Sequence, residues 1–281
     1  QILEMLEGKL PEDTDFHAPA HLHLLAEAER RAYADRASHL GDSDFYPVPV
    51  DSLLDSLYLQ GRMADFAPTQ ATESESILSR EFQLSMESFE TTHISTVDAE
   101  GHAVSLTTTL NSNYGSKVWV PGAGFFLNNE MDDFSVKPGV PNQFGLIGAE
   151  ANAIAPGKRM LSSMSPTIIE KNGELFLVLG TPGGSTIITS VLQVFLNVAE
   201  FRMPLDSAVA AGRFHHQWLP DEIMYEEGEI SPEVLDSLKK MGHQLSDRKR
   251  IALVKAIHVL ANGELHAVGD PRNPDDAAGG Y

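Results

Sequence analysis

The pattern of apolar residues changes abruptly at Thr91, and this change restricts the folds open to the chain. Upstream of it, residues 21–40 place apolar side chains at helical spacing among Ala, Leu, Glu and Arg, and Gly41 stops the pattern. Residues 51–64 predict a second, shorter helix. Residues 67–90 are rich in Thr, Ser, Glu and Gln without clear periodicity, which is typical of a linker or of an exposed segment over a core.

From Thr91 onward, alternating β-branched stretches are interleaved with apolar helical ones. The stretches with strand character lie at residues 92–97, 103–110, 124–127, 167–170, 175–179, 252–260 and 265–269. Those with helical character lie at residues 185–199, 204–211 and 232–241. Turns that contain Asn172-Gly173 and Asn262-Gly263 join pairs of strands into hairpins. Strands that pair into sheets, with helices packed outside them, predict an α/β fold.

The composition excludes several classes of partner and site. The 281 residues include 20 Lys and Arg against 40 Asp and Glu, a formal net charge of −20. Such a chain is short of the clustered cations that phosphate binding requires, so we expect no nucleic acid partner. The absence of cysteine excludes disulfides, thiolate metal sites and a cysteine nucleophile. No apolar run approaches the roughly 20 residues of a membrane span.

Two pairs of histidines are candidate metal ligands. His21 and His23, and the adjacent His215 and His216, lack the i, i+4 spacing and the carboxylate context of a metallohydrolase helix. We therefore predict no metal and no other cofactor.

A glycine-rich loop, Gly180-Thr181-Pro182-Gly183-Gly184-Ser185, precedes the helix predicted at residues 185–199. It resembles a phosphate-cradling loop but lacks the lysine and the spacing of one. Backbone N–H groups at such a helix start can still hold an anion, whether a phosphate or an oxyanion. Upstream, Asp132-Asp133 beside Asn128-Asn129-Glu130 are either solvated turn acids or a compact cluster able to bind an ammonium group.

Thr91 stands at the start of the first predicted strand, where a threonine is ordinary. Its hydroxyl would gain reactivity if the preceding peptide bond were cut. The freed α-amine, with an unperturbed pKa of roughly 7.7–8.0, could then act as its general base. In that interpretation one threonine is both nucleophile and N-terminus, and no histidine or cysteine is required.

Several motifs downstream of Thr91 follow one another in a recognisable order. They are Thr91-Thr92-His93-Ile94-Ser95, Thr109-Leu110-Asn111, Asn128-Asn129-Glu130-Met131-Asp132-Asp133-Phe134, residues 158–167, Gly180-Thr181-Pro182-Gly183-Gly184-Ser185, residues 212–218 and Gly269-Asp270-Pro271-Arg272. Their order and spacing resemble the small subunit of the γ-glutamyltranspeptidase family. Residues 26–29, 32–36 and 40–42 resemble the end of that family's large subunit.

The resemblance implies an N-terminal-nucleophile hydrolase, built as a four-layer αββα sandwich with two central sheets between helical layers. It also implies a precursor that cuts itself at the Glu90–Thr91 bond: Thr91 Oγ1 attacks the Glu90 carbonyl, and water hydrolyses the resulting ester. Residues 1–90 would be the C-terminal part of the large subunit and residues 91–281 the whole small subunit, giving a heterodimer of two pieces. Because the family's large subunit extends well upstream of Gln1, we expect the N-terminal part of the sandwich to be missing.

The activity implied by the resemblance is γ-glutamyl transfer and hydrolysis. Thr91 would attack the γ-carbonyl of glutathione or another γ-glutamyl compound to form an acyl-enzyme, and water, an amino acid or a dipeptide would accept the γ-glutamyl group. Two alternatives remain: the same fold acting on poly-γ-glutamate or a cephalosporin-type amide, and an inactive, unprocessed or truncated chain. Bacterial members of the family resemble periplasmic or secreted enzymes, and we expect this location by resemblance alone.

The resemblance assigns a role to each matched residue. These are the nucleophile Thr91 and its orienting partner Thr109, the oxyanion donors Gly183 and Gly184, the carboxylate ligands Ser162 and Ser163, and the ammonium ligands Asn111, Glu130 and Asp133. Residues 138–149 correspond to a flap over the glutamyl pocket, with Phe144 at its tip. The family's carboxylate-binding arginine lies in the upstream region, and Arg30, Arg31 and Arg36 belong to a different motif.

Overall fold

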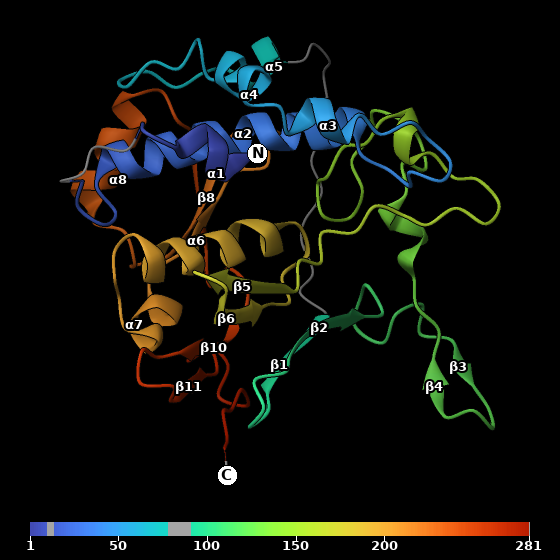
Figure 1. The fold of residues 1–281 in the computed structure, drawn as a ribbon. Coiled ribbons are helices and arrows are strands. Elements are labelled where there is room, and N and C mark those ends of the chain that lie inside the picture. The colour runs from blue at the N-terminus through green and yellow to red at the C-terminus, as the bar shows by residue number, and fades with distance from the viewer. Residues whose placement is uncertain (10–13, 78–90, 281) are drawn as a thin grey trace. The chain divides into compact units, whose positions relative to one another are not determined.

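The computed structural model describes residues 1–9, 14–77 and 91–280 (Figure 1). They divide into two compact units. The first comprises Gln1–Glu87, Met131–Ser162 and Phe214–Arg248, and the second comprises Ser88–Glu130, Ser163–Arg213 and Lys249–Tyr281. Residues downstream of Thr91 therefore contribute to both units. Glu90 and much of the predicted linker lie outside the described residues.

The first unit is built around α2 (Pro19–His39), which confirms the helix predicted at residues 21–40. The helix is buried on nearly every side, charged residues included. Burial of Glu27, Arg30 and Arg31 is tolerated because these charges are paired. Glu27 accepts a hydrogen bond from Arg31 Nη1 at 2.6 Å and lies 3.4 Å from Arg30 Nε. The other helices of this unit are α1 (Ile2–Leu6), α3 (Val50–Leu53), α4 (Ser56–Arg62), α5 (Ser74–Ile77) and α8 (Pro232–Lys240).

The single helix predicted at residues 51–64 is wrong, because Asp55 separates α3 from α4. The Asp55 carboxylate accepts a hydrogen bond from Tyr58 N at 2.9 Å and so caps the start of α4. A short-range side-chain bond to the backbone thus overrides the continuous helical pattern. The segment predicted as linker also contains one helical turn, α5, in which Ser74 is buried.

A three-stranded sheet in the first unit was not predicted. It contains β7 (Phe214–His215), β8 (Ile223–Glu226) and β9 (Leu245–Arg248) in the order β7-β8-β9. β7 pairs antiparallel with β8, and β8 pairs parallel with β9 through a connection that carries α8. Strands of two to four residues are too short to show a period-2 pattern, which explains why the sequence did not reveal them.

The second unit contains a four-stranded antiparallel sheet in the order β11-β10-β6-β5. Its strands are β5 (Thr167–Lys171), β6 (Glu174–Gly180), β10 (Lys255–Val259) and β11 (Leu265–Val268). They confirm the two hairpins predicted around Asn172-Gly173 and Asn262-Gly263. A small hairpin of β3 (Trp119–Val120) and β4 (Phe125–Phe126) replaces the single strand predicted at residues 124–127.

Two helices cover this sheet, α6 (Ile187–Ala199) and α7 (Leu205–Ala210), close to their predicted ranges (Figure 1). A single turn of 3₁₀ helix (Gly184–Thr186) leads into α6. The residues that form the core between helices and sheet are Leu177, Leu179, Val191, Val194, Val198, Leu205, Ala208, Val209, Val254 and Ala256. Strands paired in sheets under apolar helices confirm the α/β class.

The hairpin of β1 (Thr91–Val97) and β2 (Ala103–Thr109) packs against β6 and β10 through a polar face. Ser105 Oγ donates to Leu179 O at 3.0 Å and accepts from Thr167 N at 3.0 Å. The opposite face carries Ile94 and Leu106, which are 52% and 51% exposed. This is the reverse of the usual arrangement, in which the apolar face of a hairpin is the buried one.

Over the described residues, no helix combines the length and apolar character needed to cross a membrane.

Candidate active site

Thr91 is the first residue of β1 and lies directly opposite Thr109, the last residue of β2. Their Oγ1 atoms are 3.2 Å apart, with Thr91 as the donor. Asn111 N donates to Thr109 Oγ1 at 2.8 Å, which holds the Thr109 side chain from the other side. The pairing of the predicted nucleophile with its predicted orienting residue follows from the register of the hairpin.

A cavity of about 390 Å³ opens beside Thr91. Its wall combines the β1 residues Thr91–Ser95, Pro182 of the glycine-rich loop, Leu253, parts of β10 and β11, and the C-terminal segment (residues 273–279). Lys255 Nζ lies 2.9 Å from Asp276 Oδ2, and this ion pair helps to hold the C-terminal segment in the wall. Thr91 and the glycine-rich loop, distant in sequence, therefore face one cavity. Lys255 and the C-terminal segment were not identified from the sequence, since no motif marks them.

His93 is the histidine nearest to Thr91 along β1, but its ring bonds to other groups. Nδ1 lies 2.8 Å from Thr107 Oγ1, and Nε2 lies 2.9 Å from Ser95 Oγ. Burial, with a smaller effect from the Lys255 charge, lowers the pKa of His93 to about 4. Both ring nitrogens are thus engaged by the hydroxyls of Thr107 and Ser95. A role for His93 as the base of Thr91 is therefore unsupported.

Gly180 leaves the space that the His93 ring fills. A Cβ added to Gly180 would lie 2.2 Å from His93 Cε1, closer than side-chain atoms approach one another. Gly180 is the last residue of β6, so this contact ties the strand that begins with Thr91 to the strand that ends at the glycine-rich loop.

The glycine-rich loop holds the two predicted oxyanion donors. Gly183 has φ of 152° and Gly184 has φ of 55°, conformations that favour glycine. A Cβ on Gly183 would also lie 2.8 Å from Thr186 Oγ1 and 3.0 Å from Ala252 Cβ. Among the described residues, neither Gly183 N–H nor Gly184 N–H meets a hydrogen-bond acceptor. Two adjacent N–H groups without an acceptor form a site suited to an anion.

Asn111 and Glu130, two predicted ammonium ligands, come from segments that hydrogen bonds hold together. Asn111 Nδ2 donates to Asn129 O at 3.2 Å. Asn129 Oδ1 accepts from Ser112 N at 2.9 Å, and its Nδ2 donates to Ser112 Oγ at 2.9 Å. Asn111 itself is buried, with φ of 74°. The Asn111 amide oxygen and the half-buried Glu130 carboxylate are thus carried by adjoining backbone in the second unit.

Asp133 and Ser162, which were also predicted as substrate ligands, lie in the first unit. The buried Asn152 links their neighbourhoods, because its Nδ2 donates to Asp133 O at 2.7 Å and its Oδ1 accepts from Leu161 N at 3.0 Å. The Asp133 charge also acts on Arg36, whose pKa burial lowers and Asp133 helps to raise. Asn152 could not be predicted from the sequence, since an isolated Asn belongs to no motif. Ser163 lies in the second unit, where its backbone oxygen accepts from Ser165 Oγ at 3.0 Å.

The predicted flap, residues 138–149, forms a loop with many internal hydrogen bonds. Asn142 Oδ1 accepts from both Phe144 N and Leu146 N at 3.0 Å, and Asp132 Oδ2 accepts from Gln143 N at 2.8 Å. Asp132 thus stabilises this loop. Phe144 is buried within the first unit, and its backbone oxygen accepts from Gln217 Nε2 at 3.1 Å.

One group of side chains in the first unit could hold a metal by proximity: His23, Glu27 and His243. Hydrogen bonds explain why the two histidines lie close together: His23 Nδ1 lies 2.7 Å from His243 Nε2, and His23 Nε2 lies 2.8 Å from Ala67 O. If His23 Nε2–H donates to Ala67, its Nδ1 accepts from His243. Glu27 is engaged by Arg31, whose charge opposes a cation there. The donor set therefore does not favour a metal.

His21, His215 and His216 are also buried. Burial lowers the pKa of His21 and of His215 to about 4, and that of His216 to about 3. His215 Nε2 lies 2.8 Å from Gln217 Oε1, and His216 Nε2 lies 3.3 Å from Asp221 Oδ1. These contacts indicate roles in packing the first unit.

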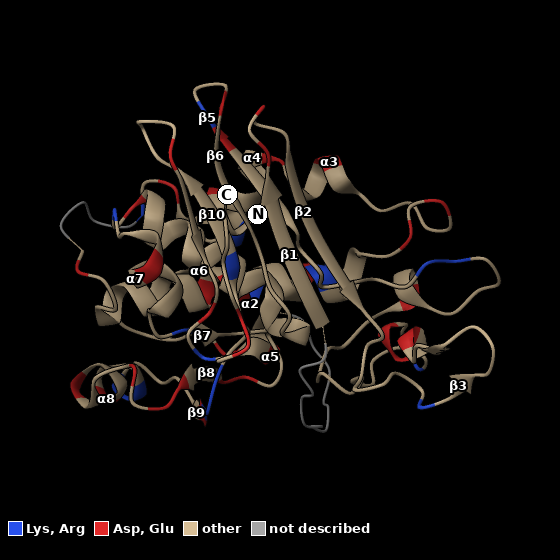
Figure 2. Cartoon of the chain, turned by 90° about the horizontal axis from the view of Figure 1, so that it is seen from below, with Lys and Arg blue, Asp and Glu red and all other residues tan. Residues whose placement is uncertain are grey.

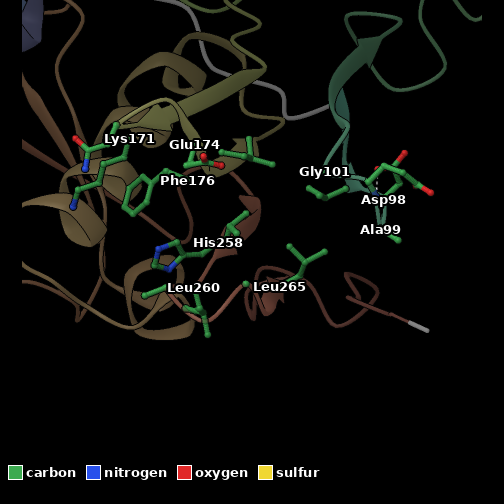
Figure 3. Close-up of a pocket in the computed structure, with 16 residues that line it drawn as sticks. Asp98, Ala99, Gly101, Lys171, Glu174, Phe176, His258, Leu260 and Leu265 are labelled. Carbon is green, nitrogen blue, oxygen red and sulfur yellow. Dashed lines mark hydrogen bonds between the residues drawn. The ribbon is translucent and has the colours of Figure 1, made fainter.

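A second hollow, of about 900 Å³, lies at the other end of the β1–β2 hairpin (Figure 3). Its walls are the turns after β1, β5 and β10. Figure 3 shows Asp98 and Gly101 on one side, with Lys171 and His258 on the other. Lys171 Nζ lies 5.3 Å from the centre of the Phe176 ring. This hollow is remote from Thr91 along the strand and contains none of the predicted site residues.

Acidic residues outnumber basic ones two to one in the sequence, and Figure 2 shows them on α7, α8 and several connecting loops. The expectation that nucleic acid is not a partner stays a prediction.

Comparison with known proteins gives three findings on sequence. A sequence model of the family described as gamma-glutamyltranspeptidase matches residues 1–280. The glutathione hydrolase proenzyme of Pseudomonas aeruginosa is 47% identical over 277 residues, which cover 97% of this chain and 49% of that protein. The protein of the same name from Escherichia coli is 44% identical over 282 residues, covering 100% of this chain and 48% of that protein. The chain thus spans about half the length of these curated relatives.

Solved structures agree with the sequence comparison. A chain of a Helicobacter pylori γ-glutamyltranspeptidase variant is 53% identical with a TM-score of 0.63, and the match covers 65% of this chain and all of that one. A chain of the Pseudomonas nitroreducens γ-glutamyltranspeptidase complexed with L-DON is 53% identical with a TM-score of 0.64, covering 68% of this chain and 98% of that one. The chain belongs to the γ-glutamyltranspeptidase family.

Proposed function

We propose that this chain is the catalytic part of an enzyme that transfers γ-glutamyl groups, after cutting itself at the Glu90–Thr91 bond. The donors are glutathione and other γ-glutamyl compounds, and the acceptors are water, amino acids or dipeptides. The observation that carries the proposal is the placement of Thr91, bonded to Thr109 and facing the same cavity as the glycine-rich loop. Membership of the family and the name glutathione hydrolase proenzyme of the relatives support it.

The chemistry proposed for Thr91 is acyl transfer in two steps. Its Oγ1 attacks the γ-carbonyl carbon, and the proton passes to the α-amine freed by self-cleavage. The C–N bond of the donor then breaks, the amine leaves with a proton, and a γ-glutamyl ester of Thr91 remains. Water or an acceptor amine attacks this ester and regenerates the Thr91 hydroxyl. Thr109, held by Asn111 N, orients the Thr91 hydroxyl in both steps.

The oxygen of the attacked carbonyl becomes negatively charged in each tetrahedral intermediate. We assign its stabilisation to Gly183 N–H and Gly184 N–H, which lack acceptors among the described residues. Donors of this kind typically contribute about 2.7–4 kcal/mol each to the transition state, because they are oriented before the charge develops.

The α-ammonium and α-carboxylate of the glutamyl group need separate ligands. We assign the ammonium to Asn111, Glu130 and Asp133, because two carboxylates and an amide oxygen favour a cation with three N–H donors. We assign the carboxylate to Ser162 and Ser163, whose hydroxyls can donate to it. A free α-ammonium distinguishes γ-glutamyl compounds from amides without one, so these assignments favour a γ-glutamyl donor.

The exposed apolar face of the β1–β2 hairpin supports a further layer in the complete protein. Ile94, Val104 and Leu106 are each more than half exposed on that face, and an apolar sheet face of this kind is ordinarily covered. The relatives are about twice as long as this chain. We infer that an N-terminal part completes a four-layer αββα sandwich.

In this scheme residues 1–90 end the large subunit and residues 91–281 form the small one. Membership of the family is the one observation that supports the proposed periplasmic or secreted location.

The test uses Thr91→Ala, with Thr92→Ala as the matched control, in the proenzyme that includes this chain. Thr92 is adjacent and exposed, and its side chain points to the opposite face of the hairpin. We expect Thr92→Ala to yield two pieces that meet at Glu90/Thr91 on a denaturing gel and to release p-nitroaniline from γ-glutamyl-p-nitroanilide. Thr91→Ala should remain one chain and release none. Cleavage or turnover by Thr91→Ala would contradict the proposal.

A further inference from the structure

The orientation of the two oxyanion donors depends on the carbonyl groups in the same peptide units. Gly183 N–H belongs to the unit that begins with Pro182 C=O, and Gly184 N–H to the unit that begins with Gly183 C=O. A trans peptide unit is planar, so its N–H and C=O point in opposite directions. Any group that holds Pro182 O and Gly183 O therefore determines where the two N–H groups point.

Thr181 holds the first of these carbonyl oxygens. Its side chain is fully buried, and Oγ1 donates to Pro182 O at 2.6 Å. The same oxygen accepts a hydrogen bond from Leu253 N at 2.8 Å. A hydroxyl has one proton, and since Leu253 supplies its own, the proton of Thr181 remains for Pro182. The direction of this bond is thus determined by the neighbouring chain segment.

Thr186 holds the second carbonyl oxygen. Its fully buried Oγ1 donates to Gly183 O at 2.8 Å, and its backbone N–H donates to the same oxygen at 3.0 Å. Two donors from one residue keep the Gly183 carbonyl directed toward the start of α6. Gly184 N–H is consequently directed away from the helix.

Ala252 closes the loop from a third side. It adopts φ of 60°, uncommon for a residue with a side chain, and its Cβ occupies the space next to Gly183. It precedes Leu253, which donates to Thr181. The loop is therefore enclosed by the segment at residues 252–253 and by the two threonine hydroxyls.

We propose that Thr181 and Thr186 are positioning residues that orient Gly183 N–H and Gly184 N–H toward the reacting oxygen. Neither threonine touches the substrate in this scheme, and each acts through a carbonyl. The inference rests on the proposed function, because it requires an oxyanion at the glycine-rich loop. The family resemblance assigned roles in this loop to Gly183 and Gly184 alone, so the roles of the Thr181 and Thr186 hydroxyls are new.

Loss of either hydroxyl should affect the transition state more than substrate binding. Valine has the shape of threonine but lacks the hydroxyl donor. Thr181→Val removes the hydroxyl bond to Pro182 O, and Thr186→Val leaves Gly183 O with the backbone N–H of residue 186 as its one remaining donor, so each N–H is less firmly oriented. Losing a whole oxyanion donor costs about 100- to 1,000-fold in kcat. A donor that is still present but less well oriented should cost less, and we expect kcat to fall roughly 10-fold for each valine variant. KM should stay within about twofold.

The experiment compares Thr181→Val and Thr186→Val with the matched variants Thr181→Ser and Thr186→Ser, which keep the hydroxyl. Rates of γ-glutamyl-p-nitroanilide hydrolysis are normalised to the cleaved fraction seen on a denaturing gel. A boronic acid analogue of glutamate provides a second measurement, because its tetrahedral adduct on Thr91 places an oxygen where the oxyanion forms. We expect its affinity to fall by about the same factor as kcat in the valine variants, while glutamate affinity is unchanged and both serine variants stay within about threefold of the parent.

Two results would overturn the inference: a valine variant with kcat within twofold of the parent, or a serine variant as impaired as its valine counterpart, which would indicate packing. If a valine variant does not cleave itself, the two subunits are co-produced as separate chains so that maturation is not needed, and thermal unfolding checks that they assemble. Thr91→Ala distinguishes failure of the positioning role from failure of the proposed function. Activity that needs Thr91 but not the two threonine hydroxyls refutes only the positioning role, whereas activity without Thr91 refutes the proposed function.

Discussion

Removal of the Asp270 carboxylate should be one of the most destabilising single changes in the second unit. Asp270 Oδ2 lies 2.6 Å from Arg213 Nη2, and the two side chains are 0% and 1% exposed. The same carboxylate accepts hydrogen bonds from Val254 N at 2.8 Å and from Arg272 N at 3.0 Å. Asp270→Ala would leave a guanidinium buried without its counter-charge and two backbone N–H groups without an acceptor.

The size of the effect follows from burial. Breaking a buried ion pair by removing one partner typically costs about 3–5 kcal/mol in the free energy of unfolding, because the remaining charge is uncompensated. The matched control is the exposed pair of Lys239 and Asp236, 4.0 Å apart with side chains 61% and 67% exposed. Asp236→Ala should cost less than about 1 kcal/mol. The contrast between the two aspartates tests burial, because both changes remove the same group.

Urea unfolding at pH 7, followed by circular dichroism in the Thr91→Ala background so that the chain stays uncut, measures both costs. Burial is the largest single influence on the pKa of Asp270 and acts to raise it. The charges of Arg213 and Arg272 and the hydrogen bonds to the carboxylate together outweigh burial, so the pKa of Asp270 lies below its usual value. Its contribution is therefore full above the unfolded carboxyl pKa of about 3.9 and is lost as pH falls through the lower folded value. The gap between parent and Asp270→Ala should narrow below about pH 4. A cost at pH 7 no larger than that of Asp236→Ala would show that burial does not set the size of the effect.

Three further predictions concern packing, acid stability and the substrate pocket. Gly180→Ala should lower the free energy of unfolding by about 1–3 kcal/mol, because its Cβ would lie 2.2 Å from His93 Cε1. The control Gly61→Ala, with open space around it in α4, should be neutral or stabilising, and equal urea midpoints for the two variants would contradict the prediction. The free energy of unfolding should decline as pH falls below about 6.5, the pKa of histidine in the unfolded chain. Burial lowers the pKa of His216 to about 3, so between these two values the unfolded state binds a proton that the folded state does not. A urea midpoint that does not change between pH 7 and pH 5 would contradict this prediction. Asn152→Ala should raise KM for the γ-glutamyl donor more than it lowers kcat, because the Asn152 amide bonds to the backbone of Asp133 and to that of Leu161, next to Ser162. An unchanged KM in steady-state assays would argue against this prediction.

Residues with a clear period were predicted reliably, and short or capped elements were not. The alternation around Thr91 predicts β1, and the apolar run after the glycine-rich loop predicts α6. β7, β8 and β9 have two to four residues each and gain their stability from pairing with one another, so no local pattern announces them. The break between α3 and α4 depends on one capping bond from Asp55.

Some residues of the candidate site could be identified from the sequence, and others could not. Thr91, Thr109, Gly183 and Gly184 stand in motifs that could be matched along the chain before any contact was known. The absence of cysteine excluded a thiol nucleophile from the sequence alone, although it did not by itself point to Thr91.

The groups that surround those residues could be identified from the three-dimensional fold but not from the sequence. Ala252, Leu253 and Lys255 lie more than 60 positions from the glycine-rich loop or from Thr91, and they reach the site because β10 pairs with β6 and packs against β1. The role of Thr181 emerges in the same way, since its hydroxyl is directed by a donor from that distant segment. Local sequence carries the identity of a reactive group, whereas its orientation is set by buried hydrogen bonds between segments that meet only after folding.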